Sequence, residues 1–193
     1  MRDSLEDFQN PLRALLEFLV KAKIPHVLIG GLAVSQLSRP RLTADIDVLT
    51  YLEEDDRIPE LIERASDSGF SPRIQNAEEF ARGNRVLLLI HDQSRIPVDL
   101  SLGMLPFEQE VIQRSYVIEA GDLRLPLPSV EDLIILKAVA HRCVDLQDIE
   151  ALVAVHSNID RKRIEAVVGE FSEALEMPEI LTDVRSLLDR KTS

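Results

Sequence analysis

Two aspartates two positions apart, Asp45 and Asp47, lie within the otherwise aliphatic segment 44–49. Alternation of acidic and aliphatic residues is the period-two pattern of a β-strand, so both carboxylates should project from one face while Ile46 and Val48 face a core. Two like charges on a half-buried sheet repel each other and are poorly solvated, so a bound cation would stabilise the pair. An exposed edge strand whose acids simply meet water would show the same spacing.

A third aspartate, Asp99, lies between Val98 and Leu100 in a later apolar segment that we expect to form a neighbouring strand. Mg²⁺ prefers carboxylate oxygens at about 2.0–2.1 Å, and two such ions about 3.5–4 Å apart can activate a hydroxyl and stabilise a leaving pyrophosphate. We therefore predict that Asp45, Asp47 and Asp99 bind Mg²⁺ or Mn²⁺. Asp99 would also accept a proton from the attacking hydroxyl.

A pair of glycines, Gly30 and Gly31, closes the short apolar strand predicted over 26–29 and precedes a short helix predicted over 32–37. Glycine lets the backbone approach a ligand closely, and the start of a helix presents free N–H groups and a positive dipole end. We expect the pair to leave room for the phosphates of a nucleotide, with Arg41 or Lys137 neutralising their charge. An ordinary tight turn would also place two glycines here.

The remaining hydrophobic pattern changes character near residue 128. Before it, helices alternate with short strands, which is typical of an α/β (α+β) fold. After it, a capping-box pattern at 129–132 begins a helical segment. We therefore expect an α/β core over 1–128 and a helical region packed on it over 129–193. The predicted helices lie at 11–22 and 57–68 and begin again near 130, 146, 160 and 178, and the predicted later strands lie at 85–90, 96–100, 115–119 and 123–127.

Composition limits the classes of protein to which the chain can belong. Of its 193 residues, 45% are hydrophobic and 29% charged, as in an ordinary soluble globule. The single cysteine, Cys143, excludes an internal disulfide, fits a reducing cytoplasm, and is expected to be buried. No secretion signal or membrane span is expected. A net charge of −12 does not attract nucleic acid, so an RNA acceptor would need a local basic surface.

Together these motifs resemble the DNA polymerase beta-like nucleotidyltransferase superfamily. Ile29-Gly30-Gly31 is followed, after thirteen residues, by Asp45-Ile46-Asp47-Val48, and Asp99 matches the third acid of that superfamily. Arg41-Leu42-Thr43 resembles its Arg-x-Thr approach to the metal strand. The resemblance covers roughly 25–101 and implies a small mixed β-sheet flanked by helices. It also implies a nucleoside triphosphate (NTP) as substrate, contacted by Gly30, Gly31, Arg41 and Thr43.

The segment from 127 to 149 resembles small prokaryotic members related to the toxins of type IV toxin–antitoxin systems, the abortive-infection E class. That resemblance implies that Lys137 and Asp148 take part in the activity. It also implies that an antitoxin is a possible partner. The residues alone leave Asp148 open between catalysis and capping of a new helix that Asp145 would begin. If one helix ran through this segment, Lys137, His141 and Asp148 would share a face.

We therefore expect a cytoplasmic enzyme that moves a nucleoside monophosphate from an NTP such as ATP to a hydroxyl and releases pyrophosphate. The acceptor would be an RNA or tRNA end, a protein side chain or a small molecule. One alternative is a catalytically silent nucleotide-binding or toxin–antitoxin regulatory module. Another is a metal-dependent phosphohydrolase that uses the same carboxylates, which the glycine pair and the absence of a histidine-rich site make less favourable.

Overall fold

The computed structural model describes residues 5–52 and 57–190. A short 3-10 helix, Leu5–Phe8, precedes the first α-helix. The strands are β1 His26–Leu28, β2 Ile46–Tyr51, β3 Phe70–Pro72, β4 Val86–His91, β5 Pro97–Gly103, β6 Tyr116–Ala120 and β7 Leu123–Leu127. The α-helices are α1 Gln9–Lys21, α2 Gly30–Leu37, α3 Ile58–Asp67, α4 Ala77–Asn84, α5 Pro106–Gln113, α6 Val130–Ala140, α7 Cys143–Val155, α8 Arg161–Ala174 and α9 Pro178–Asp189.

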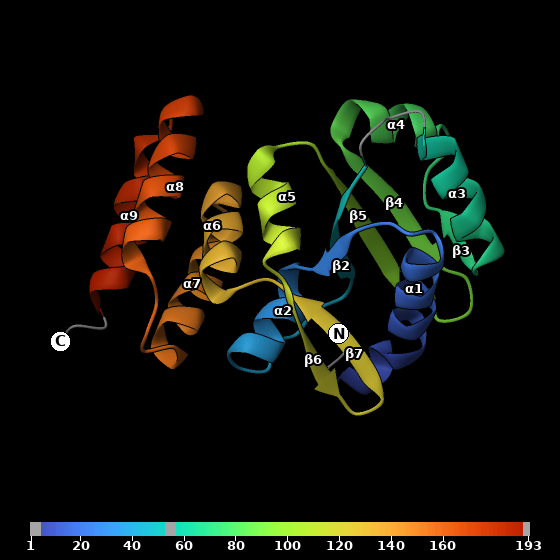
Figure 1. Cartoon of the computed structure of the whole chain (residues 1–193), viewed down its shortest axis with the longest axis horizontal. Helices are drawn as coiled ribbons and strands as arrows, with labels where there is room; N and C mark the ends of the chain where they lie inside the picture. Colours follow the sequence, from blue (N-terminus) through green and yellow to red (C-terminus); the bar gives the residue numbers. More distant parts are fainter. Residues whose placement is uncertain (1–4, 53–56, 191–193) are drawn as a thin grey trace.

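Five strands form a mixed sheet in the order β1-β2-β5-β4-β3, which confirms the expected fold class (Figure 1). β2 and β5 are parallel, whereas β1 with β2, β4 with β5 and β3 with β4 are antiparallel. β6 and β7 form a separate antiparallel hairpin. The parallel pair matters for the site, because it places Ile46 opposite Val98 and Asp47 opposite Asp99.

The two faces of the sheet have different characters. One face carries Ile46, Val48, Val98 and Leu100, which are all fully buried and belong to the main core with residues of α1 and α3. The other face carries Asp47 and Asp99, and it has a small buried apolar cluster at one end. At that end Val27 and Leu49 pack against Val111 of α5. The acids therefore lie on the less thoroughly covered face, as the period-two pattern predicts.

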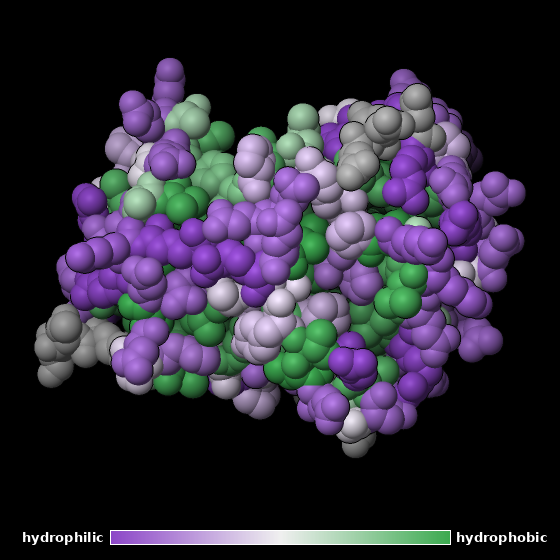
Figure 2. All heavy atoms as spheres, viewed as in Figure 1, coloured by the Kyte–Doolittle hydropathy of each residue, from purple (hydrophilic) through white to green (hydrophobic). Residues whose placement is uncertain are grey.

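Figure 1 shows the C-terminal helices α6 to α9 at one end of the molecule and the sheet with α1, α3 and α4 at the other. Between the two ends, α2 contacts α6 and α7. On the face in Figure 2, hydrophilic residues form a band across the C-terminal helices, while apolar residues gather near the β6–β7 hairpin. Among the described helices, none combines the length and the apolar character that crossing a bilayer requires.

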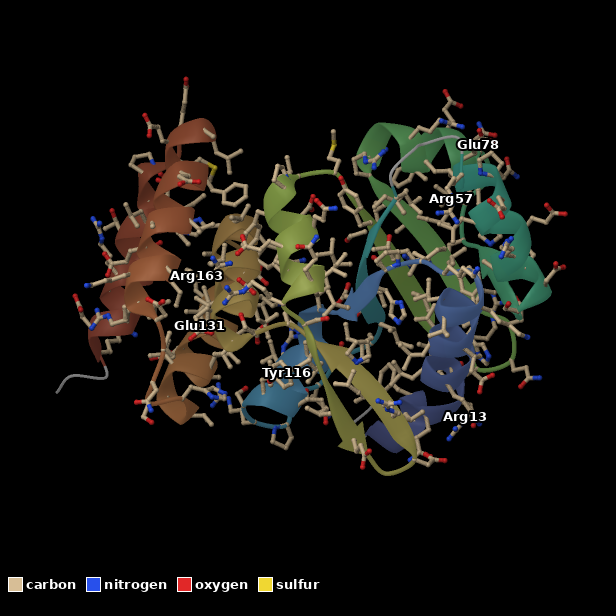
Figure 3. All side chains as sticks on the ribbon, viewed as in Figure 1. Arg13, Arg57, Glu78, Tyr116, Glu131 and Arg163 are labelled. Atoms are coloured by element: carbon tan, nitrogen blue, oxygen red, sulfur yellow. The ribbon has the colours of Figure 1, made fainter. Side chains whose placement is uncertain are left out.

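Ion pairs connect elements that are distant in sequence. Arg163 of α8 lies 2.7 Å from the fully buried Asp132 of α6 and 3.2 Å from Glu110 of α5, and Figure 3 shows it between α8 and α6. At the other end of the molecule, Arg13 of α1 pairs with Asp122 in the β6–β7 turn. The C-terminal helices are thus tied to α5, which itself packs on the sheet.

Several sequence-based expectations need correction. The short helix begins at Gly30, not at Leu32, and β3, α4 and α5 were not predicted. Cys143 is exposed, because it begins α7 on the solvent side of the helix. No single helix runs through 137–148. α6 ends at His141, which has a left-handed backbone conformation with φ of 49°.

Candidate active site

The first group of the candidate site consists of the three aspartates. Asp47 on β2 and Asp99 on β5 are direct partners in the parallel register, and Asp45 lies immediately before β2. Thr43 donates a hydrogen bond of 3.1 Å from Oγ1 to Asp45 Oδ1, which orients that carboxylate. The strands thus bring together two acids that are 52 positions apart in the sequence, as the sequence predicts.

The carboxylates destabilise each other's charged forms. Burial raises the pKa of Asp47 to about 6, and the negative charges of Asp45 and Asp99 act in the same direction. The positive charges of Lys137 and Arg142 oppose this shift, so both cations lie near enough to act on Asp47. Burial also raises the pKa of Asp99. These are the electrostatics of a site that favours a bound cation.

Arg73, which follows β3, forms an ion pair with Asp99 that the sequence did not indicate. This pair lowers the pKa of Asp99 against the larger effect of burial. Within residues 5–52 and 57–190, no three His, Cys, Asp or Glu side chains converge closely enough to hold an ion. The aspartates are neighbours, but Asp99 is turned toward Arg73 and would have to turn back to share an ion with Asp47.

Gly30 and Gly31 each lie directly against side chains of the site. Gly30 has φ of +65°, and a Cβ there would overlap the Asp47 carboxylate and lie 2.7 Å from Asp47 Cβ. A Cβ on Gly31 would overlap the guanidinium of Arg41 and lie 2.7 Å from Thr43 Oγ1. The side-chain space beside both glycines is therefore filled by this chain's own site residues. The glycines let Asp47, Arg41 and Thr43 approach the start of α2.

The loop between α2 and β2 is held by α2 itself. Ser35 Oγ accepts a hydrogen bond of 3.2 Å from Arg41 N and lies 3.3 Å from Arg41 O. The Ser35 side chain is half-buried. Ile29 N also donates to Asp47 O at 2.9 Å. These backbone contacts place the start of α2, Arg41 and Asp47 beside one another.

A second charged group joins α6 and α7. Lys137 Nζ lies 2.9 Å from Asp145 Oδ1 and 2.9 Å from Asp148 Oδ2, and at most 6% of any of these three side chains is exposed. Asp148 Oδ2 has Lys137 as its partner in an ion pair. The other oxygen of Asp148 lies 3.1 Å from Arg41 Nε. The group therefore reaches the loop beside Gly31.

Asp145 is the centre of this group. Arg142 donates to it from Nε at 2.6 Å and from its backbone N at 3.2 Å, so Asp145 also caps α7. Burial acts to raise the pKa of Asp145, but the hydrogen bonds and charges of Arg142 and Lys137 outweigh it and lower the pKa. The Arg142 side chain remains 69% exposed although its guanidinium is held.

Most of the predicted site residues lie around Asp47. Asp45 and Asp99 adjoin it, Gly30 contacts it, and Lys137 acts on it electrostatically. Thr43 is hydrogen-bonded to Asp45, and Arg41 lies beside Gly31. Asp148 lies further out and pairs with Arg41. Sequence reasoning assigned no site role to Arg73 or Arg142 and saw Asp145 only as a cap. The Asp-x-x-Asp spacing could have indicated Asp145, whereas no local signal indicates Arg73.

The donor set suits a hard divalent cation in its chemistry, because Asp45, Asp47 and Asp99 offer only carboxylate oxygen. Burial and the acidic neighbours raise the pKa of Asp47, which means that its charged form is destabilised. A bound cation would offset this destabilisation. Protein zinc sites typically include His nitrogen or Cys sulfur, which these three residues do not provide. The residues therefore fit Mg²⁺ or Mn²⁺, provided that Asp99 turns from Arg73.

Comparisons with known proteins bear on the family and the fold. A family model described as "Nucleotidyltransferase of unknown function (DUF6036)" matches residues 4–185. Comparison with curated protein sequences finds no match.

Several solved structures share the fold. An antigenic nucleotidyltransferase-like protein from Paracoccidioides brasiliensis is 16% identical, with a TM-score of 0.55 over 94% of both chains. A lincosamide antibiotic adenylyltransferase with lincomycin bound is 16% identical, with a TM-score of 0.52 over 77% of this chain and 98% of its own. The antibiotic-resistance factor ANT(2'')-Ia is 15% identical, with a TM-score of 0.51 over 99% of this chain and 95% of its own.

Proposed function

The chain belongs to this family of nucleotidyltransferases, and from that premise we propose that it moves a nucleoside monophosphate from an NTP to a hydroxyl acceptor, releasing pyrophosphate. The observation that carries the proposal is the pairing of Asp47 with Asp99 on adjacent parallel strands, beside the start of α2. Charge repulsion among these acids and Asp45 costs stability and has no structural benefit. It therefore favours a role in binding or chemistry.

On the acceptor side, Asp99 is the group that we assign to proton removal. Its pKa is raised by burial, which makes the carboxylate a better base than an exposed aspartate. Asp45 and Asp47 would hold Mg²⁺ or Mn²⁺ together with Asp99. When bound, the metal would lower the pKa of the attacking hydroxyl and neutralise charge on the phosphates.

On the donor side, we assign the triphosphate to the region between the start of α2 and the α6–α7 junction. The free N–H groups at the start of α2 suit phosphate oxygen, although the side-chain space beside Gly30 and Gly31 is occupied. Arg142 is the exposed cation that we assign to contact with the phosphates, because Asp145 holds only one edge of its guanidinium. Lys137 is held between Asp145 and Asp148 and would act through its charge on Asp47.

The acceptor and the biological setting belong to the proposal as well. RNA or tRNA ends, a protein side chain and a small molecule all carry suitable hydroxyls, and the resemblance to type IV toxins makes an antitoxin a candidate partner. ATP is one candidate donor among the NTPs, and we place the protein in the cytoplasm, where NTPs are formed. We treat 1–128 as the catalytic core and 129–193 as the region that supplies Lys137, Arg142 and Asp148.

The test is transfer of label from each α-labelled NTP, with Mg²⁺ or Mn²⁺, to total RNA and cell lysate. Asp47→Ala should lower transfer on the order of 10²–10³-fold or more while the protein stays folded. Asp122→Ala, which removes an exposed acid in the β6–β7 turn, is the matched control and should leave transfer unchanged. Transfer by Asp47→Ala at the parental rate would contradict these roles.

The product separates the alternatives. Release of pyrophosphate supports nucleotidyl transfer, whereas release of orthophosphate would indicate a phosphohydrolase. An NTP-dependent rise in melting temperature without turnover would indicate a silent binding module.

A further inference from the structure

A row of four neighbouring positions crosses the face of the sheet that carries the acids. Asp47 on β2 is paired with Asp99 on β5, and Asp99 is paired with Leu88 on β4. Arg73, directly after β3, donates from its backbone N to Leu88 O at 2.9 Å. The side chain of Arg73 then returns over β4 to form the ion pair with Asp99. Arg73 thus lies at the opposite end of this row from β2.

The geometry of the transfer reaction indicates where the acceptor lies along this row, and this step rests on the proposed function. The triphosphate is assigned to the β2 side, where Gly30, Arg142 and Arg41 lie. In phosphoryl-type transfer the attacking and leaving oxygens are roughly in line with the phosphorus atom. With the leaving pyrophosphate on the β2 side, the attacking hydroxyl enters from the β4–β3 side. The body of the acceptor then lies over Leu88 and beside Arg73.

The chemistry of Arg73 indicates what it can recognise. A guanidinium has five N–H donors in a planar fork, and the contact with Asp99 uses Nη2. The remaining donors can contact a second anion, and the whole fork becomes available to it when Asp99 turns toward Asp47 to share an ion. The Arg73 side chain is 28% exposed and Leu88 is half-buried, so both remain accessible to a bound molecule.

We propose that Arg73 is the specificity residue of the acceptor side and that the acceptor carries a phosphate or another anionic group close to its reacting hydroxyl. A positively charged acceptor, such as an aminoglycoside, would meet the guanidinium unfavourably. The anionic group can belong to a phosphorylated small molecule or to a nucleic-acid backbone, and the same chemistry recognises both. Arg is suited to this task because its fork matches phosphate and carboxylate geometry.

The experiment compares acceptors that share one nucleoside and differ in charge. Adenosine, adenosine 5′-monophosphate and a short RNA ending in adenosine all present ribose hydroxyls, and kanamycin is the cationic comparison. Transfer from an α-labelled NTP is measured for the parent, Arg73→Gln and Arg73→Lys. The control is Arg64→Gln, which removes one exposed cation from α3, on the opposite face of the sheet.

The parent should label a phosphate-bearing acceptor in preference to adenosine, and Arg73→Gln should raise the KM for that acceptor roughly 10- to 100-fold. The KM for the NTP should change much less, Arg73→Lys should recover part of the preference, and Arg64→Gln should behave as the parent does. Preference for the monophosphate indicates a small-molecule acceptor, and preference for the RNA indicates a nucleic-acid end.

Other results would overturn the role of Arg73. These are equal labelling of adenosine and both phosphorylated acceptors, preferential labelling of kanamycin, or a preference that Arg73→Gln retains. A purely structural role would lower kcat for every acceptor alike and would leave their order unchanged. Pyrophosphate release separates failure of the proposed function from failure of the role of Arg73. Its absence with every acceptor would contradict the proposed function itself.

Discussion

Two groups of acids lie near each other in this protein, one buried and one half-buried, and their charges are balanced in opposite ways. Asp145 and Asp148 at the α6–α7 junction each contact at least one cation, and the pKa of Asp145 is lowered. Asp47 on β2 has other acids as its nearest charged neighbours, and its pKa is raised to about 6. The two groups are connected, because Lys137 belongs to the first and acts electrostatically on the second.

The difference separates charges that balance one another from charges that lack a balancing partner. A balanced buried group can hold helices in place, and removing one member leaves its partners unpaired. An unbalanced group costs stability in the absence of a ligand and is retained only where the ligand is required. Substitutions of acids in the two groups should therefore change the free energy of unfolding in opposite directions.

The largest effect on stability is expected for Asp145→Ala. This change leaves Lys137 and Arg142 without their common partner and removes the cap of α7. Loss of one member of a buried ion pair costs about 3–5 kcal/mol, which denaturant unfolding would measure. Glu150→Ala, which breaks an exposed pair with Arg190, should cost less than about 1 kcal/mol. Equal costs for the two variants would mean that the α6–α7 group is not structural.

Asp47→Asn should have the opposite sign in metal-free buffer. The pKa of Asp47 is raised from 3.8 to about 6, so the folded protein retains this proton to higher pH than the unfolded chain does. The contribution to stability is fully present below about pH 4 and is lost as the pH rises to about 6. Above that pH, Asp47→Asn should increase the free energy of unfolding by up to about 3 kcal/mol. A loss of stability at pH 7 would show that Asp47 is structurally paired.

Gly30→Ala should have a smaller effect on stability. Its left-handed backbone costs a residue with a Cβ about 1–2 kcal/mol, and the added atom also displaces Asp47. Gly121→Ala is the matched control, since φ is +64° there and no atom lies within 4 Å of the added Cβ. Melting temperatures should fall in both variants, more for Gly30→Ala, and only that variant should lose transfer activity. The same loss of activity in both would remove the role given to Gly30.

Cys143→Ser should have the smallest effect, within about 0.5 kcal/mol, because the thiol is exposed although it lies between Arg142 and Asp145 in sequence. A thiol reagent should label the native protein completely without unfolding it. Protection of the thiol in the folded protein would place it inside the α6–α7 group.

Local patterns predicted the parts of this protein that depend on neighbours in sequence. The alternation around Asp47 predicted its strand and the face from which its side chain projects. Ser129 predicted the start of α6, where its Oγ accepts a hydrogen bond from Asp132 N at 3.1 Å. The same reasoning failed where the partner is distant. Arg73 and Asp99 are 26 residues apart, and their contact depends on the return of β4 between them. The exposed position of Cys143 depends on a helix break at His141 that composition does not indicate.

The sequence by itself determined which side chains face the same way, because the strand period of two and the placement of glycine are properties of the local backbone. It thereby determined the three acids, the glycine pair and the class of chemistry they suit. Only the tertiary structure decided the partners of each charge: Arg73 for Asp99, two carboxylates for Lys137, and the site's own side chains beside Gly30 and Gly31. The physical reason is that electrostatic interactions depend on distance through space, and the sheet register and the packing of α6 and α7 set those distances.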